Sequence, residues 1–81
     1  MVDYNCIEAA YCFFHQKWRV YEFSNSDTQK DDIEYAIASY VAQMNSELYA
    51  WLAKGKRGFL TDHCSFGEDI IQALTLLETK L

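Results

Sequence analysis

The chain has 81 residues, a length that suits one domain with a single hydrophobic core. Hydrophobic residues make up 51% of it and charged residues 23%, which excludes a disordered chain and predicts a globular domain. The formal net charge of −5 repels polyphosphates, so we do not expect nucleic acid as a partner. No uninterrupted apolar run approaches the ~20 residues that a membrane-spanning helix needs, so we expect no membrane contact either.

The N-terminus and the cysteines indicate the compartment. Asp3 stands where a signal peptide would carry positive charge, so we expect the protein to stay in the cytoplasm. The cysteines are Cys6, Cys12 and Cys64, an odd number that does not suggest a disulfide framework. Because the cytosol is reducing, we expect all of them to be free thiols.

The first predicted helix covers about residues 5–22. Large apolar side chains recur there at alternating steps of three and four, which places them along one side of an α-helix. They are Tyr4, Ile7, Tyr11, Phe14, Trp18 and Tyr21. Asn5 and Glu8 have the spacing of a capping box at the start of this helix. Residues 18–23 are also rich in strand-favouring side chains, so an extended final segment is the alternative.

A second helix is predicted over residues 27–54. The polar cluster 24–28 favours a turn and the next N-cap, and Gly55 can take the left-handed conformation that ends a helix. The apolar stripe consists of Ile33, Ile37, Tyr40, Met44, Leu48 and Trp51. Acidic residues gather in the opening turns, namely Asp27, Asp31, Asp32 and Glu34. Because negative charge stabilises the N-terminus of a helix, this acidic group needs no ligand to explain it.

The third helix is predicted over residues 65–80. Ser65 and Glu68 have capping-box spacing at its start. Its stripe consists of Ile70, Leu74, Leu77 and Leu81. In the connection before it, Phe59 and Leu60 are the apolar residues that we expect to tuck against the core. The predicted fold class is therefore all-α, a small three-helix bundle in a single domain over residues 1–81.

The first two helices also carry apolar residues off their main stripes, which predicts self-association. A bundle monomer buries about one face of each helix, so a second apolar face is most simply covered by another copy. The residues expected at this homodimer interface are Phe13, Val20, Tyr35, Ala38, Ala42 and Tyr49. The alternative is that alanine and tyrosine side chains simply face water there.

Cysteine and histidine suggest a further possibility, a metal site. Cys12 and His15 lie three residues apart on the first helix, and His63 and Cys64 could add two ligands from the later connection. A set of two cysteines and two histidines suits zinc, although this spacing departs from zinc-finger patterns. The alternative is packed thiols and surface imidazoles. Cys64 beside His63 is also the one candidate nucleophile, but adjacent residues rarely face each other.

The connection after the second predicted helix is basic. Lys54, Lys56 and Arg57 alternate with glycines, a pattern that could contact an anion or a partner through charge and free N–H groups. The glycine spacing differs from that of a phosphate-binding P-loop. Cations that stabilise the C-terminus of a helix explain the same residues.

These patterns predict a non-catalytic protein-interaction module, a regulator or adaptor that presents apolar helical surface and needs no cofactor. The first alternative is a metal-binding or small-ligand-binding protein that uses Cys12, His15, His63 and Cys64. The second is a nucleic-acid-binding accessory that uses the basic connection 54–57.

Overall fold

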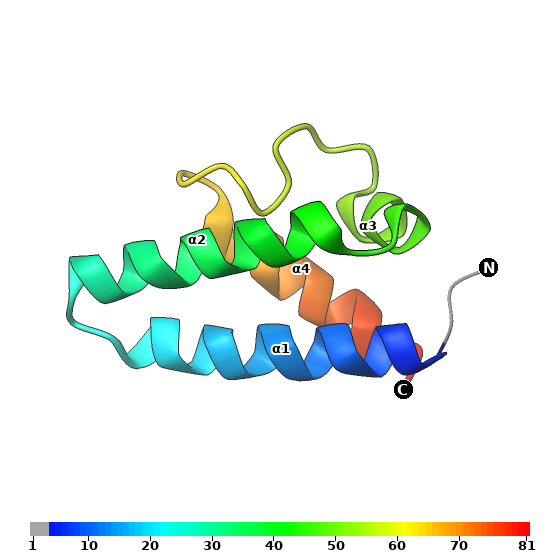
Figure 1. Ribbon diagram of the computed structural model, residues 1–81, viewed down its shortest axis with the longest axis horizontal. Coiled ribbons are helices and arrows are strands. Elements are labelled where there is room, and N and C mark those ends of the chain that lie inside the picture. The colour runs from blue at the N-terminus through cyan, green and yellow to red at the C-terminus, as the bar shows by residue number, and fades with distance from the viewer. Residues whose placement is uncertain (1–3) are drawn as a thin grey trace.

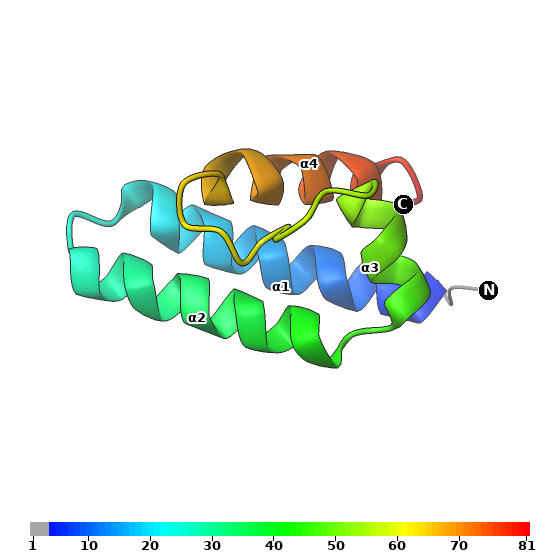
Figure 2. The same cartoon turned by 90° about the horizontal axis from the view of Figure 1, so that it is seen from above.

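The computed structural model describes residues 4–81 and has four helices in that part of the chain. They are α1 (Tyr4–Phe23), α2 (Asp27–Gln43), α3 (Ser46–Ala53) and α4 (Phe66–Glu78). Helix α1 packs against both α2 and α4 and runs antiparallel to them, and Figure 2 shows it between the two. Helix α3 turns across one end of the bundle (Figures 1 and 2). The described residues contain no strand, so the prediction of an all-α fold is confirmed.

Helix α1 buries the middle of its predicted apolar stripe, whereas Tyr4 at its start is 54% exposed. The side chains that it buries are Ile7, Ala10 and Phe14. Residues 18–23 are helical, so the alternative of an extended final segment is wrong. The three-residue step between Trp18 and Tyr21 lets their rings stack with centroids 5.7 Å apart, which a helix permits and a strand does not. Because the helix already includes Tyr4, Asn5 lies within its first turn rather than before it.

The prediction of one helix over residues 27–54 is wrong, because the helix is interrupted at residues 44 and 45, between α2 and α3. Met44 has an extended backbone, with φ −77° and ψ 165°. The Asn45 side chain then caps α3, since its Oδ1 accepts hydrogen bonds from the N–H groups of Glu47 at 2.9 Å and Leu48 at 3.1 Å. Asparagine favours this local arrangement over a helix interior. Within the described residues the bundle therefore has four helices rather than three.

The segment 54–65 closes over the core. Lys54 has a left-handed backbone with φ 51°, and Gly55 follows with φ 79°, so α3 ends next to the predicted glycine. Phe59 and Leu60 are buried, as the sequence predicts. The segment crosses the face of the bundle on which α3 also lies (Figures 1 and 2). Its two apolar side chains thereby cover a face that the long helices leave open.

Helix α4 completes the core and begins one residue later than predicted. The side chains that it buries are Phe66, Asp69, Ile70, Ala73 and Leu77. Ser65 precedes the helix, but its side chain accepts no hydrogen bond from the helix N-terminus. Its hydroxyl instead donates to Asp69 Oδ2 at 3.2 Å. The capping box predicted for Ser65 and Glu68 is therefore wrong.

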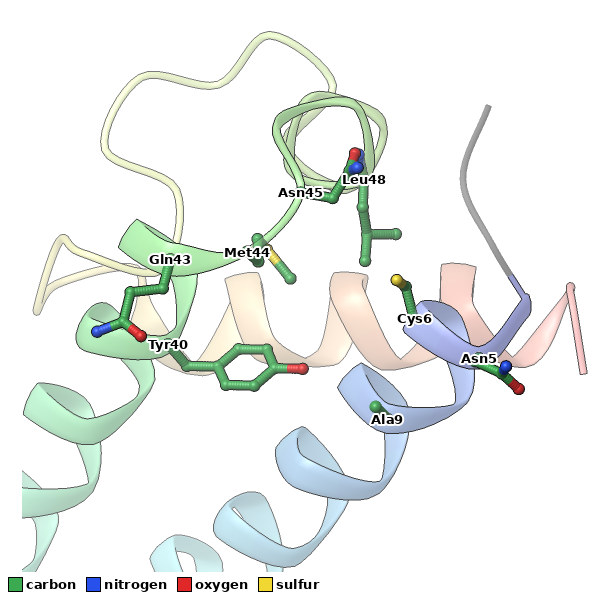
Figure 3. Close-up of a pocket in the computed structure, with 8 residues that line it drawn as sticks. All are labelled: Asn5, Cys6, Ala9, Tyr40, Gln43, Met44, Asn45 and Leu48. Atoms are coloured by element: carbon green, nitrogen blue, oxygen red, sulfur yellow. The ribbon is translucent and has the colours of Figure 1, made fainter.

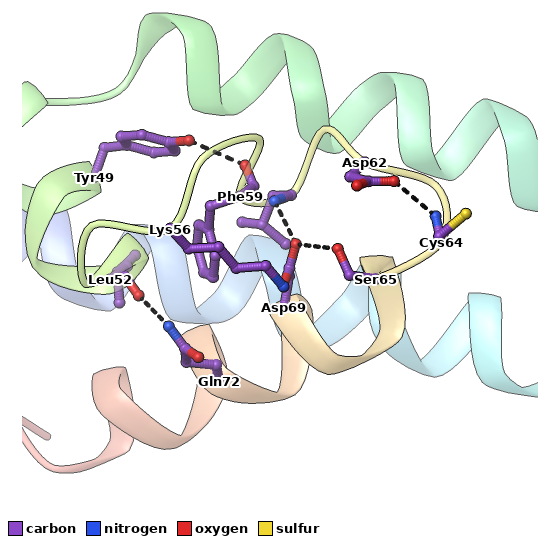
Figure 4. A network of polar contacts seen from close by, with 10 residues as sticks. Tyr49, Leu52, Lys56, Phe59, Asp62, Cys64, Ser65, Asp69 and Gln72 are labelled. Carbon is purple, nitrogen blue, oxygen red and sulfur yellow. Dashed lines mark hydrogen bonds and ion pairs between the residues drawn. The ribbon is translucent and has the colours of Figure 1, made fainter.

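One buried carboxylate fixes the path of the segment 54–65. Asp69 is 1% exposed, and its oxygens accept hydrogen bonds from the Lys56 ammonium group and the Ser65 hydroxyl (Figure 4). Oδ2 also accepts from the Leu60 N–H at 2.9 Å. Leu60 has φ 64°, a left-handed conformation that costs a branched residue about 1–2 kcal/mol. The carboxylate therefore stabilises a strained turn that places the Leu60 side chain in the core.

We expect Asp69→Ala to lower the free energy of unfolding by about 3 kcal/mol, because a buried N–H and an ammonium group lose their acceptor. Urea denaturation measures this change. Asp69→Asn, which keeps an oxygen acceptor, should cost less. The matched control is Glu68→Ala, an exposed acid one residue earlier in α4, which should change stability by less than about 1 kcal/mol. Equal losses in Asp69→Ala and Glu68→Ala would contradict the role given to the buried carboxylate.

Candidate functional site

An open pocket of about 410 Å³ lies where the start of α1 meets the end of α2 and the start of α3 (Figure 3). Apolar side chains and sulfur form most of its walls, and amide side chains add polar groups. The lining residues are Asn5, Cys6, Ala9, Tyr40, Gln43, Met44, Asn45 and Leu48. Its volume is in the range of small-ligand sites, and a flexible methionine in the wall adapts to the shape of an occupant.

Aromatic contacts hold the Tyr40 side chain in this pocket. Its ring stacks on Phe13 with centroids 4.3 Å apart and meets Phe14 edge-on at 5.5 Å. Burial raises the pKa of the Tyr40 phenol above its ordinary value of 10.0, and the neighbouring Cys6 adds to this effect. The phenol therefore stays neutral at physiological pH. A neutral phenol among apolar walls is suited to binding an apolar group with one hydrogen-bonding atom.

Two of the predicted interface residues make contacts within the monomer. Phe13 is half-buried in its stack with Tyr40. Tyr49 is also half-buried, packs edge-on against the Phe59 ring at 6.0 Å, and donates its hydroxyl to the Phe59 carbonyl at 3.1 Å. The sequence pattern assigns Phe13 and Tyr49 to a second apolar face of the first two predicted helices. The fold of the monomer already covers much of their apolar area.

The other predicted interface residues remain at the surface. Tyr35 is 76% exposed and Val20 is 46% exposed. Ala42 is exposed and Ala38 is half-buried. Three of the four lie on α2, at spacings of three and four residues that place them on one side of that helix. We call Tyr35, Ala38 and Ala42 the outer face of α2.

The predicted set of two cysteines and two histidines is not brought together. Cys12 is exposed on α1, and His15 lies on the same helix with its ring stacked on Tyr11 at 5.5 Å. His63 and Cys64 lie in the segment before α4, and the Cys64 backbone N–H donates to Asp62 (Figure 4). Across residues 4–81, the one group of three ligand-type side chains close enough to share an ion contains His63 but none of the other three.

That group joins His63 to the acidic start of α2. His63 Nδ1 lies 2.9 Å from Oε1 and 3.1 Å from Oε2 of Glu34. Asp31 completes the group, since one ligand atom from each residue lies within 4.8 Å of the others. Tyr21 donates its hydroxyl to Glu34 Oε2 at 3.3 Å. The Glu34 carboxylate accepts a hydrogen bond from the protonated His63 ring, and this bond and the negative charge of Glu34 raise the pKa of His63 above its ordinary value of 6.5.

The sequence interpretation missed this group because helix electrostatics already explained the acidic residues. Asp31 and Glu34 lie three residues apart and so share one side of α2, which is the signal that the sequence carries. The histidine comes from a segment 29 residues further along the chain. Only the path of the segment 54–65 brings it there.

The basic connection is partly used by the fold. The Lys56 ammonium group pairs with the buried Asp69 carboxylate, and this hydrogen bond raises the pKa of Lys56. Lys54 forms the C-cap of α3 and is exposed, as is Arg57. Asp69 balances the charge of Lys56. Lys54 and Arg57 are therefore the two cations of this connection that remain for the predicted contact with an anion or a partner.

Comparisons with known protein families, curated proteins and solved structures find no match to this chain. The described residues also contain no helix with the length and apolar character required to cross a membrane.

The contact between His63 and Glu34 predicts a pH dependence. In the presence of a chelator, NMR titration of the His63 ring should give a pKa above 6.5, and Glu34→Gln should return it toward that value. Because the pKa is raised in the folded state, the pair stabilises the fold below about pH 6.5 and loses this effect as the pH rises through the folded value. Glu8→Gln, which alters an exposed acid near the other end of the bundle, is the control. An unshifted His63 in the parent protein would contradict the contact.

Proposed function

We propose that this protein is a non-catalytic protein-interaction module that forms a homodimer through the outer face of α2. The observation that carries the proposal is Tyr35, a large aromatic side chain that is 76% exposed in the middle of a helix. It lies two residues from each of the buried Ile33 and Ile37, so it projects from the opposite side of α2. Tyrosine supplies large contact area with a polar tip, which suits a protein interface.

The register of the side chains on the outer face of α2 supports an isologous contact. If two copies of α2 pack antiparallel about a two-fold axis beside Ala38 and Ser39, Tyr35 of each copy lies over Ala42 of the other. The small side chains of Ala38 and Ala42 let the helices approach closely, and each tyrosine fills the space over an alanine. The same surface is therefore complementary to itself.

Charge favours this antiparallel arrangement over a parallel one. The first half of α2 carries Asp27, Asp31 and Asp32, and the chain as a whole is acidic. A parallel pair would place these carboxylates beside each other, which opposes association. An antiparallel pair separates them toward opposite ends of the contact.

The free thiols suit a protein of a reducing compartment, and we propose the cytoplasm as its location. Cys6, Cys12 and Cys64 are all unpaired and exposed in the fold. An oxidising compartment would expose such thiols to intermolecular disulfide formation.

The dimer is tested by exchanging the two side chains that face each other. Sedimentation equilibrium should show that Tyr35→Ala weakens self-association by about tenfold or more, because a central tyrosine is lost. Ala42→Tyr should also weaken it, since two tyrosines then collide. The double variant Tyr35→Ala with Ala42→Tyr should recover most of the affinity, because each tyrosine again faces an alanine.

The control for this experiment is Phe23→Ala, which removes an aromatic ring of similar exposure, 75%, from the end of α1. Its self-association should match that of the parent protein. A parent protein that remains monomeric at millimolar concentration, or a double variant as weak as both single variants, would rule out this interface.

The pocket favours a second candidate function, the binding of an apolar side chain or small ligand. Indole is a suitable probe because it joins an apolar ring to one N–H donor. We expect it to shift the backbone NMR signals of Cys6, Tyr40 and Leu48, which line the pocket. Ala9→Phe should abolish these shifts by filling the pocket, whereas Thr75→Phe, on the exposed side of α4, should not. Shifts that persist in Ala9→Phe would contradict binding at this site.

A further inference from the structure

Two carboxylates and one imidazole converge at the surface between α2 and the segment 54–65. Asp31 and Glu34 come from neighbouring turns of α2, and His63 comes from the chain just before α4. One ligand atom from each lies within 4.8 Å of the other two. Side chains from two separate parts of the chain therefore point at one small volume, and they include a nitrogen ligand as well as oxygen ligands.

The spacing of the His63 and Glu34 atoms matches the coordination sphere of a metal ion, whereas Asp31, whose ligand atom lies within 4.8 Å of theirs, would move closer to bind. Zinc binds imidazole nitrogen and carboxylate oxygen at about 2.0–2.2 Å, so two ligands at angles of 90–109° lie roughly 2.8–3.6 Å apart. In the structure, His63 Nδ1 lies 2.9 Å and 3.1 Å from the two Glu34 oxygens. An ion can therefore replace the proton between these groups with little movement of either side chain.

The central carboxylate is held in place by its surroundings. The Glu34 side chain is only 15% exposed, although it lies beside solvent. Tyr21 donates a hydrogen bond to its Oε2 at 3.3 Å, and the Tyr21 ring is itself fixed between Trp18 and Phe66. Hydrogen bonds to the groups that bind a metal orient them and lower the entropic cost of binding. Tyr21 would act here as a positioning residue.

The local charge also favours a cation. Asp31, Glu34 and Asp62 all act electrostatically on His63. Lys30 is a cation on the same helix, and its ammonium group lies 5.6 Å from the centre of the Tyr21 ring rather than against the carboxylates. Negative charge therefore exceeds positive charge around His63, and a divalent ion would reduce the repulsion between the carboxylates.

We propose that Asp31, Glu34 and His63 bind a divalent transition-metal ion of the zinc class. One imidazole and two carboxylates form a mixed nitrogen and oxygen set that suits zinc better than calcium or magnesium, which prefer oxygen alone. Three protein ligands leave at least one coordination position for water. The ion would fasten the segment 54–65 to α2. This site differs from the cysteine and histidine set predicted from sequence, and it does not depend on the dimer.

The test is a zinc titration of the full chain, monitored by calorimetry. The protein is first treated with a chelator, and the chelator is then removed. We expect one zinc ion per chain. His63→Ala, Glu34→Gln and Asp31→Asn should each weaken binding by about tenfold or more, while circular dichroism confirms that the variants are folded. Cobalt(II) bound in place of zinc should show the visible absorption bands that are typical of nitrogen and oxygen ligands. An excess of magnesium should leave zinc binding unchanged, because magnesium prefers oxygen ligands.

Three control variants distinguish zinc binding at this site from binding elsewhere on the protein. His15→Ala and Cys64→Ser alter the remaining histidine and the thiol next to His63, and both should bind zinc like the parent protein. Tyr35→Ala, which weakens the proposed dimer, should also bind zinc normally. Weak binding of several ions per chain would indicate adventitious surface contacts and overturn the proposal. So would an affinity that depends on His15 or Cys64 but not on Glu34.

Discussion

The Asp69 carboxylate is the constraint on which the arrangement of the surface depends. It accepts hydrogen bonds from Lys56, Leu60 and Ser65, so it ties both ends and the middle of the segment 54–65 to the first turn of α4. A carboxylate that is 1% exposed is stable only with such partners. Its position has two consequences: Phe59 and Leu60 can fill the open face of the bundle, and the chain that follows leads toward α2.

The apolar stripes predicted the long helices well, but they could not reveal the break near Met44. In the predicted single helix, Met44 and Leu48 are four residues apart and share the core side, so the stripe passes through the break without a change of phase. Leu48 is indeed buried, and Met44 packs against the core. The interruption depends on Asn45, whose side chain replaces backbone hydrogen bonds at the start of α3. Asn45 with an acid two residues later, Glu47, is the local signal of a helix start, and hydrophobic periodicity outweighed it.

The candidate sites were less predictable, because they depend on contacts between distant segments. Phe13 and Tyr49 lie off the predicted stripes, and each finds an aromatic partner, Tyr40 or Phe59, that periodicity cannot identify. The same limit applies to His63, since its neighbour Glu34 is 29 residues away and loop geometry brings them together. Exposure of Tyr35 was easier to predict, because helix geometry alone places it opposite the buried side of α2.

Helix α2 therefore serves three environments, and its periodicity assigns a different residue to each. Successive residues are rotated by about 100°, so the buried Ile33, the half-buried Glu34 and the exposed Tyr35 point in three different directions. Ile33 packs in the core, Glu34 contacts the segment before α4, and Tyr35 is open to a partner. A partner bound at Tyr35 approaches from solvent and not through the bundle. Asp31, the third proposed ligand, lies four residues before Tyr35 and so borders the outer face of α2. The proposed dimer and the proposed metal site are therefore neighbours on one helix, but they use different side chains.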